Sequence, residues 1–357
     1  MKSKVYFVAV KDAGDIPTVC DSLRKLLDAS RVLDVIGKDD RVAVKIHFGE
    51  EGNTGFVNPA YARVICDGIS QAGGRPFLSD ANTLYKGRRT NAKDHLEIAR
   101  AHGFTRKATG VDVVIPDDTI KENTVDIPID GTYITMAKIA RLYADADALA
   151  AITHFKGHMI TGFGGAIKNL GMGCATREGK LMQHNDNAPV FYGDNCIGCG
   201  ACAEVCPVGA ISMVDGKSRL DKAQCIGCAN CVGVCPTMAL FVDMAAGDKV
   251  QLKMAEYAAA ALKGKEKRSV FINFAVNINK ECDCWGLENP RIAPDIGICA
   301  SFDPVSIDKA CFDLVNKACG KDVFKQTHPE QDGTRQLLHA QELGMGTVEY
   351  ELIPVGQ

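Results

Sequence analysis

The feature that most constrains this chain is a cysteine pattern that occurs twice. C-x2-C-x2-C-x3-C-P is found at 196–207 and again at 225–236, within the matching segments CIGCGACAEVCPVGAI and CIGCANCVGVCPTMAL. Such a repeat predicts two copies of one small folding unit. The chain has 16 cysteines, and its first residues indicate a strand rather than a secretory signal. We therefore expect thiolates that hold metal, not a disulfide framework.

The repeat resembles bacterial two-cluster ferredoxins. In that arrangement the first three cysteines of one motif bind one 4Fe–4S cluster, and the fourth completes the other cluster. The resemblance implies two ligand sets: Cys196, Cys199, Cys202 and Cys235 for cluster 1, and Cys225, Cys228, Cys231 and Cys206 for cluster 2. It also implies one-electron transfer at low potential with a redox partner such as a ferredoxin, a flavodoxin or a reductase. Paired zinc knuckles are the alternative, but zinc motifs rarely combine this spacing with a following proline.

The remainder of the chain alternates strand-like and helix-like segments. Strand-like runs lie at 4–10, 41–46, 75–79, 111–116, 147–155, 268–278, 294–301 and 348–355. Helical patterns lie at about 17–34, 58–72, 91–103, 136–143, 251–263 and 303–319. This alternation predicts βαβ units and a mostly parallel sheet. We therefore expect one α/β domain, formed by 1–187 and 246–357, with a ferredoxin-like two-cluster α+β domain inserted at 188–245.

Composition excludes several classes of partner. The formal net charge is −3, from 41 Lys+Arg against 44 Asp+Glu, and no basic block is present, so we expect no nucleic-acid partner. No apolar run approaches the length of about 18 residues that a membrane-spanning helix needs. We expect a cytoplasmic protein without membrane contact.

Three segments of the α/β part resemble a large family known only as domain of unknown function 362, whose members often carry ferredoxin inserts. They are VAVKIHFGEEGNTGFVNP, ITHFKGHMITGFGGAIKNLGMGC and PDIGICASFDPVSIDKA. The family name implies no chemistry, so the site must be argued from the residues.

Candidate catalytic residues gather between 154 and 184. His154 follows a strand, where open α/β sheets bind ligands, and GFGGAIKNLGMG comes shortly after it. That segment lacks G-x-G-x-x-G, which disfavours a dinucleotide site. We expect His154 and His158, four residues apart on a helical turn, to be catalytic proton donors or metal ligands, and Lys168 to anchor a small anionic substrate. The alternative for each histidine is a hydrogen-bonded structural role.

The spacing of His158, Lys168 and His184 resembles the nickel-pincer lactate racemase family. In that family a histidine transfers protons, a lysine carries a pyridinium-derived nickel cofactor, and a second histidine ligates nickel. The resemblance implies these three roles, in that order, for the three residues of this chain.

A third metal site is expected at E-C-D-C-W. Cys282 and Cys284 follow a strand, and alternate residues at a strand end can reach one metal; we assign His184 as a further ligand. Cys174 and Cys299 could join them, and a reactive or structural cysteine pair is the alternative. Lys45 and His47, at the end of another strand, are expected to face the same crevice or simply to end that strand with charge.

These features favour an iron–sulfur oxidoreductase whose two clusters deliver electrons to a pocket in the α/β domain. The sequence leaves the substrate, the physiological electron donor and the oligomeric state open. One alternative is a non-catalytic electron carrier or cluster-maturation partner. Another is a pincer-cofactor isomerase whose clusters are structural.

Overall fold

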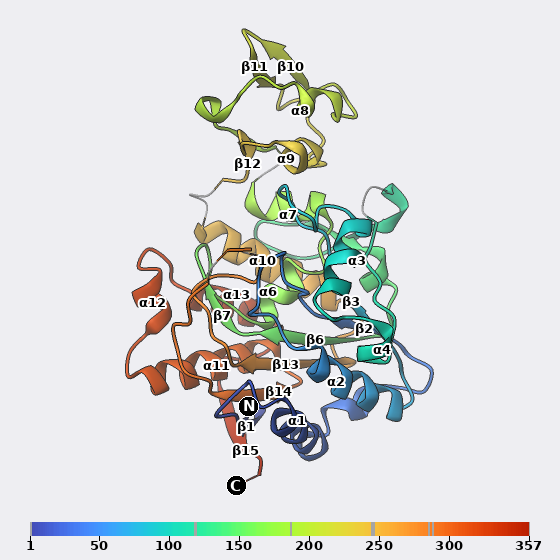
Figure 1. Cartoon of the computed structure of the whole chain (residues 1–357), viewed down its shortest axis with the longest axis vertical. Helices are drawn as coiled ribbons and strands as arrows, with labels where there is room; N and C mark the ends of the chain where they lie inside the picture. Colours follow the sequence, from blue (N-terminus) through green and yellow to red (C-terminus); the bar gives the residue numbers. More distant parts are fainter. Residues whose placement is uncertain are drawn as a thin grey trace.

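The computed structural model describes residues 2–117, 120–185, 188–243, 247–284, 286–287 and 289–356. Its centre is a seven-stranded sheet in the order β15-β1-β14-β13-β6-β2-β3 (Figure 1). These strands are β1 (Ser3–Ala9), β2 (Arg41–Lys45), β3 (Arg75–Ser79), β6 (Ala148–His154), β13 (Ser269–Ala275), β14 (Gly297–Ser301) and β15 (Tyr350–Pro354). Strand β14 is antiparallel to β1 and β13, and the other neighbours are parallel. The expected mostly parallel sheet is confirmed.

Helices cover both faces of this sheet. One face carries α1 (Ile16–Ser30), η1 (Val32–Val35), α2 (Pro59–Gln71) and α4 (Arg106–Thr109). The other face carries α6 (Ala166–Gly171), α10 (Gly247–Leu262), α11 (Pro304–Cys319) and α13 (Thr334–Glu342). Along β2, Val42 and Val44 pack in the first layer and Ala43 in the second, because successive strand residues point to opposite faces. A sheet buried on both faces accounts for the continuous apolar runs in the sequence.

Shorter elements surround these layers. They are α3 (Ala92–Ala101), η2 (Lys121–Asn123), β4 (Thr124–Pro128), β5 (Met136–Ala140), α5 (Arg141–Ala144), β7 (Lys156–His158), β8 (Gly162–Gly164), α7 (Arg177–His184) and α12 (Val323–Thr327). Strands β4 and β5 pair antiparallel, as do β7 and β8. Within the described part of the chain, no helix combines the length and the apolar character needed to cross a membrane.

Two predicted elements are wrong. The helix expected at 136–143 is strand β5 over 136–140, and only its last residues lie in helix α5; in the strand, buried Ala137 and Ile139 flank the more exposed Lys138, a period of two rather than 3.6. The strand expected at 111–116 forms only one bridge, from Val113 to Leu78 at the sheet edge. Pro116 closely follows and cannot donate a ladder hydrogen bond.

The cysteine repeat folds as a small lobe at one end of the molecule (Figure 1). Its elements are β9 (Val190–Phe191), η3 (Gly193–Asn195), α8 (Ala201–Glu204), β10 (Ile211–Val214), β11 (Lys217–Leu220), α9 (Asn230–Val234) and β12 (Leu240–Phe241). Strand β9 pairs with β12 and β10 with β11, both antiparallel. The expected domain boundaries lie between 187 and 188 and between 245 and 246; residues 186–187 and 244–246 at these boundaries lie outside the described residues.

The repeat is visible in the backbone of this lobe. Left-handed residues recur in pairs at equivalent positions of the two halves: Gly198 with Gly227, Gly200 with Ala229, and Gly209 with Met238. The lobe packs on the α/β domain where Leu84 and Leu181 meet Val232 in one apolar cluster. Arg177 Nη2 also donates to the Ala229 carbonyl at 2.9 Å. The duplicated unit is thus docked on α7.

Candidate functional site

A cavity of about 550 Å³ lies at the carboxyl ends of β2, β3 and β6. Lys45, Asp80 and His154, at or directly after these three strand ends, line it. This is where open α/β sheets bind ligands. The small lobe completes the wall with Tyr192, Asn195, Met238, Phe241 and Val242.

Lys168 projects into this cavity from α6. A side chain at Gly164 would collide with the Lys168 side chain, so this glycine leaves the room that the lysine occupies. Lys168 Nζ donates to Cys282 Sγ at 3.3 Å. Burial disfavours the lysine's charge, but the sulfurs of Cys282 and Cys284 outweigh it and raise the pKa of Lys168. The ammonium therefore stays charged inside the protein.

His158, at the end of β7, has one tautomer fixed by its surroundings. Its Nδ1 accepts the backbone N–H groups of Ile160 at 3.2 Å and Thr161 at 3.1 Å. Burial, with Lys168 nearby, lowers the pKa of His158 to about 4. The neutral ring consequently carries its proton on Nε2, and the His158 side chain donates to Cys282.

Cys282 lies among three donors. The pKa of the Cys282 thiol lies well below its ordinary value, chiefly because Cys284 donates a hydrogen bond to its sulfur. Burial acts to raise this pKa, but the charge of Lys168 and a hydrogen bond from His158 lower it further. The hydrogen bond to Cys282, together with burial, raises the pKa of Cys284. The pair is therefore one thiolate and one thiol, both in the cavity wall.

The loop that carries both cysteines is clamped through Asp283. Its Oδ1 pairs with His154 Nδ1 at 2.8 Å and its Oδ2 with Lys156 Nζ at 3.0 Å. Its carbonyl accepts the Glu50 N–H at 2.9 Å. Burial opposes ionisation, but the charges of His154 and Lys156 outweigh it and lower the pKa of Asp283. The carboxylate thus fixes the position of the two thiols.

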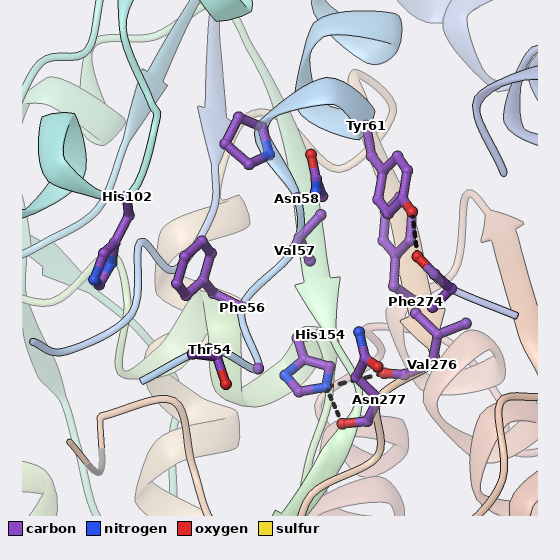
Figure 2. Close-up of a pocket in the computed structure, with 13 residues that line it drawn as sticks. Thr54, Phe56, Val57, Asn58, Tyr61, His102, His154, Phe274, Val276 and Asn277 are labelled. Carbon is purple, nitrogen blue, oxygen red and sulfur yellow. Dashed lines mark hydrogen bonds between the residues drawn. The ribbon is translucent and has the colours of Figure 1, made fainter. Parts of the chain in front are cut away.

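His154 also forms the wall of a second cavity, of about 270 Å³ (Figure 2). There its Nε2 lies 3.1 Å from the carbonyls of Val276 and Asn277, so both ring nitrogens bind within the protein. The expected helical turn from His154 to His158 is wrong, because the two residues end separate strands, β6 and β7. Their imidazoles are placed by different networks.

A second buried network also lines the cavity. Lys45 Nζ lies 2.8 Å from both Asp80 Oδ1 and Asn169 Oδ1. Arg89 bridges Asp80 at 3.5 Å and Glu50 at 3.1 Å. Burial opposes ionisation of Asp80, but Lys45 and nearby histidines hold its pKa well below its usual range.

Some of these residues could have been found from the sequence. Lys45 and His47 line the cavity as expected. Sequence reasoning missed Asp80, although its place directly after β3 is a usable signal. It also missed Arg89, which lies in a loop without periodicity, and Asp283, which stands between the two cysteines.

His184 ends α7 and lines the same cavity as Cys282 and Cys284. Burial, with His158 and Lys168, lowers the pKa of His184 to about 3. Its buried Nδ1 has no hydrogen-bond partner among the described residues. The structure therefore gathers the three expected ligands of the third metal site around one space.

Cys174 and Cys299 do not join that site. Neither Cys174 nor Cys299, both among the described residues, lines the cavity. Cys299, on β14, is hydrogen-bonded to Cys311 of α11 instead. Across the described residues, no three His, Cys, Asp or Glu side chains lie close enough to hold a metal ion as they stand. The third metal site stays a prediction.

Four of the eight cysteines of the lobe line a third, much smaller cavity. The four expected for cluster 2, which come from both halves of the repeat, line one cavity of about 20 Å³: Cys206, Cys225, Cys228 and Cys231. Backbone N–H groups approach the fourth cysteine of each motif in the same way, Ala210 to Cys206 Sγ and Ala239 to Cys235 Sγ, each at 3.2 Å. Iron–sulfur clusters are bound by cysteine sulfurs, and backbone N–H groups commonly form hydrogen bonds to those sulfurs.

Comparison with known proteins gives a family but no activity. The lactate racemase apoprotein from Thermoanaerobacterium thermosaccharolyticum is 12% identical with a TM-score of 0.46, and the match covers 87% of this chain and 57% of that one. A protein from Thermotoga maritima is 13% identical with a TM-score of 0.37, covering 85% of this chain and 58% of that one. This chain thus spans less than two thirds of either protein. No curated protein matches it. Residues 42–313 match the family model described as a domain of unknown function, and the chain therefore belongs to the family DUF362.

Proposed function

We propose that this protein is an iron–sulfur oxidoreductase that transfers electrons to a substrate in the 550 Å³ cavity. The eight cysteines of the lobe would hold two 4Fe–4S clusters, each supplying one electron at low potential. The observation that carries the proposal is the shared wall of the cavity. Asn195, which directly precedes Cys196, and Met238, three residues after Cys235, line it beside Lys168 and Cys282.

The residues of the cavity support a small anionic substrate. The volume of the cavity lies in the usual range for small-molecule sites, about 300–1,000 Å³. Lys168 presents a buried positive charge that a carboxylate or phosphate would pair with, and His158 offers an Nε2 proton beside it. We assign His154 a positioning role, since it acts on the thiols through Asp283. A ferredoxin, a flavodoxin or a reductase would be the redox partner.

Metal analysis of the anaerobically purified protein tests the clusters. We expect about eight irons and eight sulfides per chain. Cys206→Ala should remove the cluster otherwise held by Cys225, Cys228 and Cys231, and Cys235→Ala, the matched variant in the other half, should remove the other cluster. Loss of the opposite cluster in either variant would exclude the crossed ligation.

Substrate-dependent reoxidation of reduced protein tests the cavity. Lys168→Ala and His158→Ala should abolish it without changing the iron content. Normal reoxidation in both variants would favour the alternative of a non-catalytic electron carrier or maturation partner. Metal above eight irons that disappears in Cys282→Ser/Cys284→Ser would support the third metal site with His184.

A pincer-type isomerase is the second candidate. The observation that favours it is that His158, Lys168 and His184, the residues of the pincer-like spacing, all line one cavity. Nickel in the purified protein, together with a covalent adduct on Lys168 in the intact mass, would support this function. An unmodified Lys168 and a protein free of nickel would contradict it.

A further inference from the structure

We propose that Cys282 and Cys284 form a redox-active dithiol that reduces small disulfides bearing acidic groups. The inference deepens the proposed function by naming a substrate class for its cavity. It rests on the proposed function in one respect: the two clusters would supply the electrons that return the disulfide to the dithiol.

The geometry supplies both parts of a dithiol centre. Cys282 is 4% exposed, lines the cavity and receives hydrogen bonds from Lys168 and His158, which suits the attacking thiolate. Cys284 lies two residues further on the same loop, in hydrogen-bond contact with Cys282, and suits the resolving thiol. Because Asp283, the residue between them, is clamped by buried partners, the loop holds the two cysteines in fixed positions.

The lining of the cavity selects the substrate class. Lys168 lines it with its Nζ 3.3 Å from Cys282 Sγ, whereas the ammonium groups of Lys156 and Lys45 in the same wall are already paired, with Asp283 at 3.0 Å and with Asp80 at 2.8 Å. A disulfide with an arm that ends in a carboxylate would meet the Lys168 ammonium while its sulfur approaches Cys282. The cavity has the size of a small-molecule site rather than of a protein interface.

The exchange balances in two steps. The Cys282 thiolate attacks the substrate disulfide, forming a mixed disulfide and releasing the first substrate thiolate. Cys284 then passes its proton to the released substrate thiolate and attacks Cys282 Sγ, which releases the second substrate thiolate and leaves the Cys282–Cys284 disulfide. The substrate is reduced by two electrons, and the same number with two protons returns the pair to the dithiol.

Digestion with trypsin places Cys282 and Cys284 together in one peptide. Cleavage after Lys280 and Arg291 gives the peptide ECDCWGLENPR, in which Cys282 and Cys284 are the only cysteines. The native, cluster-loaded protein is incubated anaerobically with dithiodipropionate, a dianionic disulfide, or with hydroxyethyl disulfide, a neutral one. It is then alkylated, digested and weighed by mass spectrometry.

We expect the wild-type peptide to lose two hydrogens and retain no adduct, about tenfold faster with the dianion, which corresponds to roughly 1.4 kcal/mol. Cys284→Ser should trap mercaptopropionate on Cys282, and Lys168→Met should remove the preference for the dianion. Cys319→Ser, a control on α11, should change nothing.

Three outcomes would overturn the inference. One is a wild-type peptide that keeps both thiols. Another is a Cys284→Ser protein without an adduct on Cys282. The third is a pair that reacts only after chelation, which would make it a metal site. Iron and sulfide counts on the same samples report separately on the proposed function.

Discussion

Replacing Asp283 with asparagine tests the clamp that holds the cysteine loop. Asp283 is fully buried and bridges His154 at 2.8 Å and Lys156 at 3.0 Å. Asp283→Asn keeps the shape of the side chain but turns its amide N–H₂ group toward either His154 or Lys156, both of which are donors. It also removes the negative charge that compensates the buried Lys156 ammonium. Removing one partner of a buried ion pair costs about 3–5 kcal/mol of unfolding free energy. At about 2 °C per kcal/mol for a chain of this size, the melting temperature should fall by about 6–10 °C.

Asp112→Asn is the matched control. Asp112 accepts both of its contacts from Arg106 at 2.7 Å, but the two side chains are 63% and 73% exposed. An exposed pair of this kind contributes about 0–1 kcal/mol. Both variants are melted anaerobically beside wild type, followed by far-ultraviolet circular dichroism. Equal melting temperatures for the two variants would refute the clamp.

Two further predictions concern stability. Because burial lowers the pKa of His158 to about 4, the unfolded chain takes up a proton near pH 6.5 that the folded chain refuses. The contribution of His158 to stability is therefore complete above pH 6.5, and up to about 3 kcal/mol of it is lost as the pH drops toward 4. Because the pKa of His184 is lowered too, His158→Gln should reduce the fall in melting temperature without abolishing it. Gly171→Ala should cost about 1–3 kcal/mol, measured by urea unfolding, because its Cβ would collide with the Met254 carbonyl of α10. Gly193→Ala should be neutral, because its Cβ would make only an ordinary van der Waals contact with the Phe191 ring at 3.4 Å.

Local patterns in the sequence predicted much of the fold. The runs at β2, β3 and β6 are short, apolar and bounded by polar residues, so a sheet buried on both faces follows from them. The segment at β5 misled because Met136–Ala140 is too short for its period of two to stand out. The helix at α2 was recognisable from Asn58, whose side chain accepts the Ala60 N–H, followed by Pro59 at the first turn.

The candidate site was only partly predictable, since its contacts join distant parts of the chain. His158, Lys168 and Cys282 were each singled out by local context, but the 3.3 Å contact of Lys168 with Cys282 spans 114 residues. The partnership of His154 with Asp283 spans 129 residues. A spacing rule applies within one strand, loop or helix, and it cannot say which loop folds over which. The assignment of Cys282 to a thiolate therefore required the three-dimensional arrangement of its donors.

The same arrangement explains how the lobe and the cavity can depend on each other. Helix α7 contacts both: Arg177 and Leu181 hold Ala229 and Val232 of the lobe, while His184 at its end lines the cavity. Figure 1 shows α9 and β12 of the lobe beside this helix. A helix moves as a unit because its backbone hydrogen bonds are internal, so a shift of the lobe displaces His184 as well. The position of the lobe is thus a determinant of the cavity's shape, because the lobe contacts α7 and also lines the cavity itself with Tyr192 and Phe241.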